Sequence, residues 1–239
     1  MTMQTDDPGP ALVPGAHRTI RALGVDEGPF TGVLVTAGDG VAVRSDAEAL
    51  SGWVGWAHAG HEHVAGPLDL VRRHGGHDVL LPWCTESVDV FLGRRAAAGA
   101  PLTAGEVSTL AVSMLRGVAE MGGEHDRGRW WLTDGGRPLF VIGDGVDVRE
   151  ESAALLARLR LDIEDRMLGR VLDAVCDGLV EGLGRPRMLT AQLERWEADL
   201  LAIAAPRMLE TSLHAPERVR AIAALRDAAP SRVPSSRRA

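Results

Sequence analysis

The sequence contains no tyrosine and only three phenylalanines and two cysteines among its 239 residues. Cys84 and Cys176 lack the spacing of a metal or redox motif, so they exclude a disulfide framework and predict two reduced thiols. No stretch approaches the roughly 18 apolar residues of a membrane-spanning helix. The N-terminus also lacks the basic and apolar run of a signal peptide. The sequence therefore predicts a cytoplasmic protein.

Positive charge is outnumbered by negative charge, and the formal net charge is −7. An acidic chain is not attracted to nucleic acid by bulk electrostatics, which argues against a nucleic-acid partner. Apolar residues make up 45% of the chain. At this length they can form the core of one large domain or of two small lobes.

Strand-like runs separated by glycine-rich turns fill the first third of the chain. Val33–Thr36 and Val41–Arg44 flank an Asp-Gly turn, which is typical of a β-hairpin. A helix is predicted over Ser45–Ala59, with Ser45 as its cap. The other predicted strands of this small, mostly antiparallel sheet are Arg18–Leu23, Pro67–Arg72 and Asp78–Trp83.

Helical periodicity dominates from Thr85 onwards. The strongest helix is Thr103–Met121, which begins with a capping box of Thr103 and Glu106 and carries one apolar stripe. Further helices are predicted over Ser87–Ala98, Glu150–Leu183 (as two helices), Thr190–Ala205 and Pro216–Ala228. Within Glu150–Leu183 the residues expected on one apolar face are Leu159, Ile163, Met167, Val171, Val175 and Leu179.

Between the helices, Gly122–Gly145 predicts a loop followed by a small hairpin with strands Trp130–Leu132 and Leu139–Ile142. Neighbouring side chains of a strand point to opposite faces, so Trp130 and Trp131 should diverge. The whole pattern divides the chain into a disordered segment (1–15), a β-rich lobe (16–84), a helical lobe (85–229) and a disordered basic tail (230–239).

This order of elements resembles a protein kinase, in particular a degenerate bacterial serine/threonine kinase-type domain. VAVR at Val41–Arg44 resembles the V-A-x-K strand, and His61–Val71 resembles the H-P-H-V turn with the strand after it. Val79–Met121 resembles the hinge and the two helices that follow. LTDGGRPLFVIGDG resembles the hairpin that carries the metal loop, and Val146–Leu159 the central helix. The resemblance implies an α+β fold with a small antiparallel β lobe and a mostly helical C-terminal lobe.

The same resemblance implies that the catalytic positions are degenerate. Phosphoryl transfer needs a lysine on the phosphates, metal ligands and a carboxylate near the acceptor hydroxyl. Arg44 stands at the lysine position and Arg129 at that of the metal-binding asparagine. Glu124 stands at the catalytic aspartate, and Asp144 lies at the metal loop. The resemblance therefore implies no working catalytic residue, no cofactor and no metal.

Two flanking segments agree with this loss. The Gly28–Val33 loop contains Pro29, which lacks one of the N–H groups that phosphates would use. Only Val146 separates the metal-loop remnant from the next helix, so the activation segment that docks a substrate is missing.

The resulting hypothesis is a pseudokinase that acts as a regulatory or scaffolding module. Its expected partner is another protein or a second copy of the chain, with Trp130, Trp131 and Trp196 as candidate partner-binding residues. Trp130 or Trp131 could also pack where adenine would otherwise lie. Two alternatives stay open: a noncanonical nucleotide-binding phosphotransferase that uses Glu124 or Asp144, and an unrelated helical adaptor.

Three smaller interpretations remain. His58, His61 and His63 could suggest zinc, but closed zinc sites usually add cysteines, and the kinase-like turn accounts for His61 and His63. Arg44 could form an ion pair with Glu48 or Glu62. In the tail, Arg232, Arg237 and Arg238 lie in a Pro/Ser-rich run, which would serve as a membrane tether if the natural chain continues past Ala239.

Overall fold

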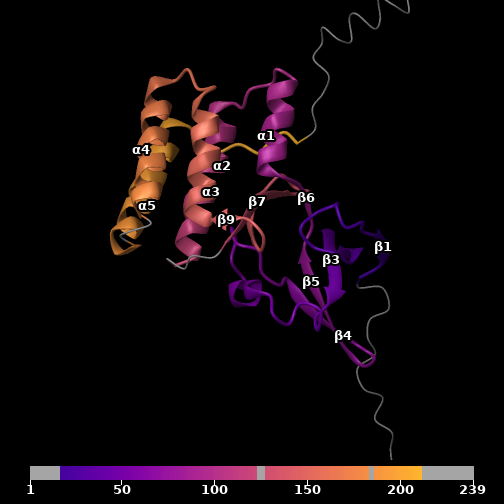
Figure 1. The fold of residues 1–239 in the computed structure, drawn as a ribbon. Helices are drawn as coiled ribbons and strands as arrows, with labels where there is room; N and C mark the ends of the chain where they lie inside the picture. The colour runs from indigo at the N-terminus through magenta and orange to yellow at the C-terminus, as the bar shows by residue number, and fades with distance from the viewer. Residues whose placement is uncertain (1–16, 123–126, 183–185, 212–239) are drawn as a thin grey trace, which may run out of the picture. The chain divides into compact units, whose positions relative to one another are not determined.

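The computed structural model describes residues 17–122, 127–182 and 186–211 (Figure 1). Residues 1–209 form one compact unit, and residues 210–239 fall in a second. The described part is α+β, with antiparallel sheets and five α-helices. None of its helices is both long enough and apolar enough to cross a membrane.

The first sheet has five strands in the order β1-β2-β3-β5-β4, and all neighbours are antiparallel. Alternating β-branched residues form the hairpin of β2 (Val33–Ala37) and β3 (Gly40–Asp46), in which Leu34 faces Val43. The other strands are β1 (Thr19–Ala22), β4 (Asp69–Arg73) and β5 (Gly76–Pro82). All five predicted strands of this region are confirmed.

The second sheet contains the predicted small hairpin. Strands β7 (Arg127–Thr133) and β8 (Pro138–Ile142) pair antiparallel, with Trp130 opposite Phe140. Two short strands that the sequence did not predict, β6 (Cys84–Ser87) and β9 (Val146–Asp147), both pair with β7.

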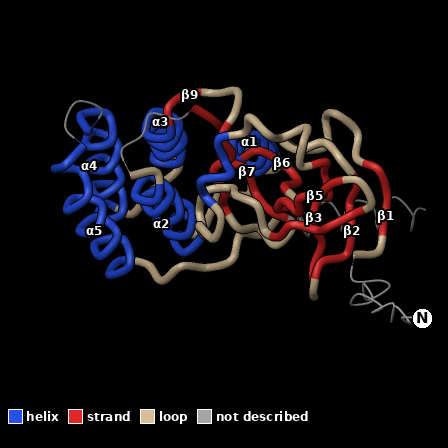
Figure 2. The backbone as a smooth tube through the Cα atoms, turned by 90° about the horizontal axis from the view of Figure 1, so that it is seen from below, coloured by secondary structure: helices blue, strands red, loops and turns tan. Residues whose placement is uncertain are grey.

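Helices α2, α3, α4 and α5 lie on one side of β7, and the strands of the first sheet lie on the other (Figure 2). Helix α2 (Ala104–Glu120) has the predicted capping box, because Thr103 Oγ1 accepts from the Glu106 N–H while the Glu106 carboxylate accepts from the Thr103 N–H. The others are α1 (Val88–Ala97), α3 (Val148–Arg160), α4 (Arg166–Gly182) and α5 (Pro186–Ile203). The predicted helices between Ser87 and Ala205 are thus confirmed, apart from their exact ends.

The predicted helix over Ser45–Ala59 is wrong. Strand β3 continues to Asp46, turns follow, and the only helical part is a 3-10 turn at Val54–His58. The tryptophans of this segment fold back on it, because Trp56 Nε1 donates to the carbonyl of Leu50 at 2.6 Å. Gly55 permits this arrangement, since a Cβ there would lie 2.0 Å from the Trp53 ring. Packing of aromatic rings has overridden the helical pattern.

The predicted apolar face of Glu150–Leu183 is also partly wrong. The chain leaves α3 at Leu161 and restarts a helix at Arg166, and this break shifts the helical phase. As a result, Met167 is exposed, and the next residue, Leu168, is buried in its place. The buried residues of α4 are Leu168, Leu172, Val175 and Leu179.

The core of the helical part is centred on Trp130, which is fully buried. Its Nε1 donates to Ser152 Oγ of α3 at 2.9 Å, and its ring lies against Gly117 of α2. A Cβ at Gly117 would lie 2.5 Å from Cη2 of the indole.

We therefore expect Gly117→Ala to lower the free energy of unfolding by about 1–3 kcal/mol, as overpacking of a core does. Chemical denaturation monitored by circular dichroism measures this change. Gly143→Ala is the matched control, because a Cβ there meets no atom within 4 Å. Equal stability of the two variants would show that the indole does not pack closely on α2.

Some predictions fall on residues that the structure does not describe. They are the helix Pro216–Ala228, the terminal segments 1–15 and 230–239, and the tail arginines Arg232, Arg237 and Arg238.

Candidate functional site: a filled cleft beside the hairpin

An aromatic cluster occupies the region between the first sheet and the β7–β8 hairpin. It consists of Phe30, Trp53, Trp56, Trp83 and Trp131. These rings pack with apolar residues of both sheets: Val43, Val79, Leu81, Cys84, Leu139 and Val141. In the kinase resemblance this is the place of the nucleotide cleft. The Gly28–Val33 loop (the glycine loop), the hinge and the β7–β8 hairpin all contribute residues to it.

Phe30 and Trp53 make the central contact of this aromatic cluster. Their ring centroids are 5.3 Å apart in an edge-to-face arrangement, and Trp56 lies edge-on to Trp53 at 6.4 Å. Such pairs contribute about 0.5–1.5 kcal/mol beyond the burial of their area. Trp53 Nε1 also donates to the carbonyl of Ile142, the last residue of β8, at 3.2 Å. The segment that was predicted to be a helix therefore covers the end of the hairpin strand.

Arg44 does not point towards this aromatic cluster. Side chains alternate along β3, and Val43 faces the cluster, whereas Ala42 packs with Leu80 on the opposite face. Arg44 shares the face of Ala42, where its Nε lies 3.7 Å from Asp78 Oδ2. The sequence predicts Glu48 or Glu62 as the ion-pair partner of Arg44. In the structure its partner is Asp78.

The β3 residue next to the glycine loop on the cluster side is Ser45, whose hydroxyl donates to the carbonyl of Thr31. The alignment of VAVR with the kinase V-A-x-K strand is thus offset by one residue. In the kinase resemblance, Ser45, whose hydroxyl is already bonded to the backbone, would then stand where a lysine reaches the phosphates.

A cavity of about 550 Å³ lies beside the glycine loop, lined by Phe30, Arg44, Asp46 and Asp78 among others. Its charges are already paired, because Arg73 contacts both Asp46 and Asp78 at 2.8 Å. The carboxylates of Asp46 and Asp78 offset Arg44 in the lining and Arg73 beside it. This cavity therefore carries no net positive charge that would attract a triphosphate.

The remaining candidate catalytic residues do not converge. Arg129 is exposed on β7, on the same face of the strand as Trp131. Asp144 is exposed in the turn that follows β8. Glu124 lies outside the described residues. Within the described ranges, no three His, Cys, Asp or Glu side chains are arranged to hold a metal ion.

The three tryptophans considered as partner-binding residues have different surroundings. Trp130 is fully buried, and Trp196 of α5 is 9% exposed and packs against Gly178 of α4. Neither presents its ring to solvent in the described part of the chain, so a partner would not reach them without a rearrangement. Trp131 is half-buried and packs against the aromatic cluster. This agrees with the interpretation that one ring of the pair is core and the other lies in the cleft region.

A carboxylate clamp joins α2 to the segment before β4. Glu120 accepts from the backbone N–H groups of Glu62, His63 and Val64 at 3.3, 2.8 and 3.1 Å. It also bonds to His63 Nδ1 at 2.8 Å. Burial alone would raise the pKa of Glu120, but the hydrogen bonds from His63 and the backbone outweigh it and hold the pKa below its ordinary 4.5.

The neighbouring backbone ties this segment to the second sheet. The Phe140 N–H donates to the carbonyl of His63, and the Ala65 N–H donates to the carbonyl of Phe140, both at 2.8 Å. Val64 forms a parallel bridge with Phe140. Of the three histidines, His63 binds Glu120, while His58 Nδ1 lies 3.2 Å from His61 Nδ1.

Both cysteines are free, as predicted. Burial raises the pKa of the Cys84 thiol to about 12 and that of Cys176 to about 11. Thiols with such pKa values stay protonated near neutral pH and are poor nucleophiles.

Comparison with known proteins adds no family to this description. No protein-family model matches the chain, and no curated protein matches it at a significant level.

The sequence held one signal about this site that motif reading missed. The chain contains neither lysine nor asparagine at any position. These are the residue types that a kinase places on the phosphates and on the second metal ion. The absence of both residue types is therefore stronger evidence against the usual phosphate and metal contacts than any single motif.

Proposed function

We propose that this chain is a kinase-like module that does not transfer phosphate and acts by binding another protein. The observation that carries the proposal is the aromatic cluster. The side chains that border a nucleotide cleft in the resemblance pack against one another, and the central Phe30–Trp53 contact joins the glycine loop to the cover of the hairpin.

The chemistry of the sequence supports the same conclusion. A chain without lysine or asparagine cannot assemble the usual phosphate and metal contacts of a kinase. Arg44 is not equivalent to lysine, because its guanidinium is a wide planar fork, and here it faces Asp78 on the other side of the sheet. The five-stranded sheet followed by helices favours this function over that of a helical adaptor.

A thermal-shift titration with Mg-ATP tests the loss of nucleotide chemistry. We expect no change in Tm at millimolar Mg-ATP, because a ligand raises Tm only if it binds the folded state. The same absence of a shift is expected for Phe30→Ala, which removes the ring from the cleft region but adds no phosphate ligand. A rise of several degrees that Arg44→Ala abolishes would overturn the proposal and favour the phosphotransferase.

A further inference from the structure

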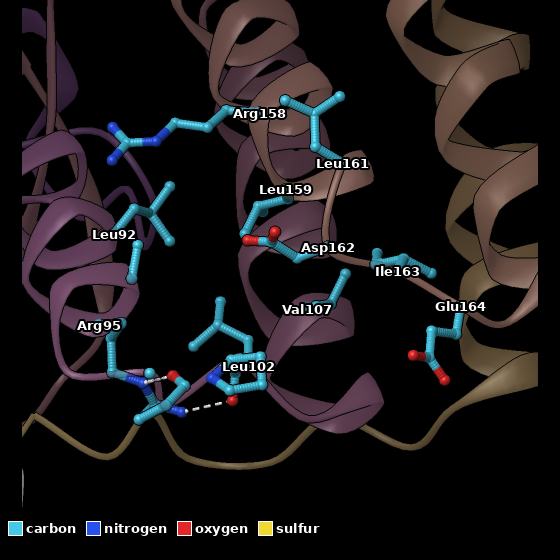
Figure 3. Close-up of a pocket in the computed structure, with 14 residues that line it drawn as sticks. Leu92, Arg95, Leu102, Val107, Arg158, Leu159, Leu161, Asp162, Ile163 and Glu164 are labelled. Carbon is cyan, nitrogen blue, oxygen red and sulfur yellow. Dashed lines mark hydrogen bonds between the residues drawn. The ribbon is translucent and has the colours of Figure 1, made fainter.

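An open groove lies at the opposite end of α1 from the second sheet (Figure 3). Its volume is about 500 Å³, within the range that ligand sites occupy. The end of α1, the connection into α2, and the end of α3 with the residues after it form its walls. Its apolar lining comes from Leu92, Leu102, Val107, Leu159, Leu161 and Ile163.

The groove is electronegative. Helices α1 and α3 end at it with partial negative charge, whereas α2 begins beside it at Thr103 with partial positive charge, so the negative charge comes from side chains rather than from helix ends. Asp162 and Glu164 add two carboxylates, and Figure 3 shows the Asp162 side chain directed into the groove. In the described part of the chain, neither of these carboxylates has a hydrogen bond or ion pair.

The two arginines of the groove do not cancel this charge. Arg95 is buried and contacts Glu106 at 3.2 Å, and it also donates to the carbonyls of Ala100 and Pro101. Arg158 forms an ion pair with Asp89. Each arginine is thus already matched by a carboxylate, which leaves the charge of Asp162 and Glu164 uncompensated.

An apolar side chain stands beside these carboxylates. Leu161 is 83% exposed, although it directly follows the last residue of α3. The groove therefore offers apolar contacts and negative charge side by side.

We propose that this groove binds a short segment of a partner protein in which arginine or lysine alternates with leucine-like side chains. The cations would face Asp162 and Glu164, and the apolar side chains would enter between Leu102 and Leu161. This inference rests on the proposed role as a protein-binding module, but it does not depend on the filled cleft. The nucleotide test and the groove test can therefore fail separately.

The test uses a fluorescein-labelled peptide, Arg-Arg-Gly-Leu-Ala-Leu, and measures fluorescence anisotropy with the full chain. We expect saturable binding that weakens as salt is added, because ions screen exposed charges. The peptide Glu-Glu-Gly-Leu-Ala-Leu should not bind. No saturable binding of the first peptide at millimolar protein, or equal binding of the two peptides, would overturn the proposal.

Variants locate the binding surface. The double variant Asp162→Asn with Glu164→Gln should bind the first peptide about tenfold more weakly, since rim charges set association and salt dependence. Leu161→Ser should weaken it in addition. The matched control is Glu194→Gln with Asp199→Asn, which removes the same charge from two exposed positions of α5. These sites are exposed, so unchanged thermal melts serve as the folding control.

Equal losses in the groove variant and the control would overturn the assignment, because the peptide would then respond only to net charge. A second copy of the chain is the other possible occupant. A concentration-dependent dimer in sedimentation that the groove variant alone dissociates would overturn the choice of a separate partner.

Discussion

Glu106→Gln should lower the free energy of unfolding by about 3–5 kcal/mol, the cost of breaking a buried ion pair by removing one partner. Arg95 and Glu106 are both almost fully buried, and their side chains meet at 3.2 and 3.4 Å. Glutamine still offers an oxygen to the Thr103 N–H, so the helix cap is largely retained. The loss then reports the broken contact between Arg95 and Glu106. Urea denaturation followed by circular dichroism measures it.

The control is the double variant Arg95→Met with Glu106→Gln. The double variant lacks both charges of the pair, so part of the stability should return. It should therefore be more stable than Glu106→Gln alone. If the two changes simply add, the ion pair is not the reason for the loss, and the geometry of the α1–α2 corner needs another explanation.

Glu120→Gln should destabilise the chain by about 2–4 kcal/mol, because hydrogen bonds to charged groups are stronger than neutral ones and unpaired buried donors are costly. The clamp satisfies three backbone N–H groups and His63 with one carboxylate. A glutamine has only one acceptor oxygen, and its NH2 group would face some of the backbone N–H groups that now donate to the carboxylate. Chemical denaturation at neutral pH, with Glu194→Gln as the exposed control, measures the difference.

The effect should depend on pH with a definite sign. The pKa of Glu120 in the folded protein lies below its ordinary 4.5, so its contribution is complete above that pH and is lost as pH falls through the folded pKa. The stability gap between the parent chain and Glu120→Gln should therefore narrow below pH 4.5. A gap that stays constant down to pH 3 would contradict the assignment of the charge to the clamp.

Strands and helices with a regular apolar period could be predicted from the sequence. The β2–β3 hairpin follows from alternating Val residues around an Asp-Gly turn, and α2 follows from its capping box and one continuous apolar stripe. In both cases local propensity and the packing of the final fold favour the same structure.

The segment after β3 shows why the rest could not be predicted. Its apolar spacing fits a helix, but Trp53 and Trp56 belong to a cluster formed with Phe30 and with β8, which are distant in sequence. Local periodicity contains no information about such contacts. The direction of the Arg44 side chain was unpredictable for a similar reason, because a one-residue offset in a strand reverses every side chain.

The candidate site was predictable only in part. The composition shows that two residue types used by kinases, lysine and asparagine, are absent. No local pattern indicates that Glu120 would bind a turn almost sixty residues earlier in the chain. The groove at α1 and α3 also depends on where helices end, and the ends of helices are the least predictable part of a sequence pattern.

The carboxylate clamp at Glu120 restricts the movement of the segment before β4 relative to α2. Enzymes with two lobes usually open and close about a hinge, and a few residues absorb the change. Here the segment before β4 is bound by Glu120 and by the Val64–Phe140 bridge, so a movement of this segment away from α2 and β8 would have to break several partly buried hydrogen bonds at once. Under the proposed function, a protein held in one conformation would convey its signal only by whether a partner is bound.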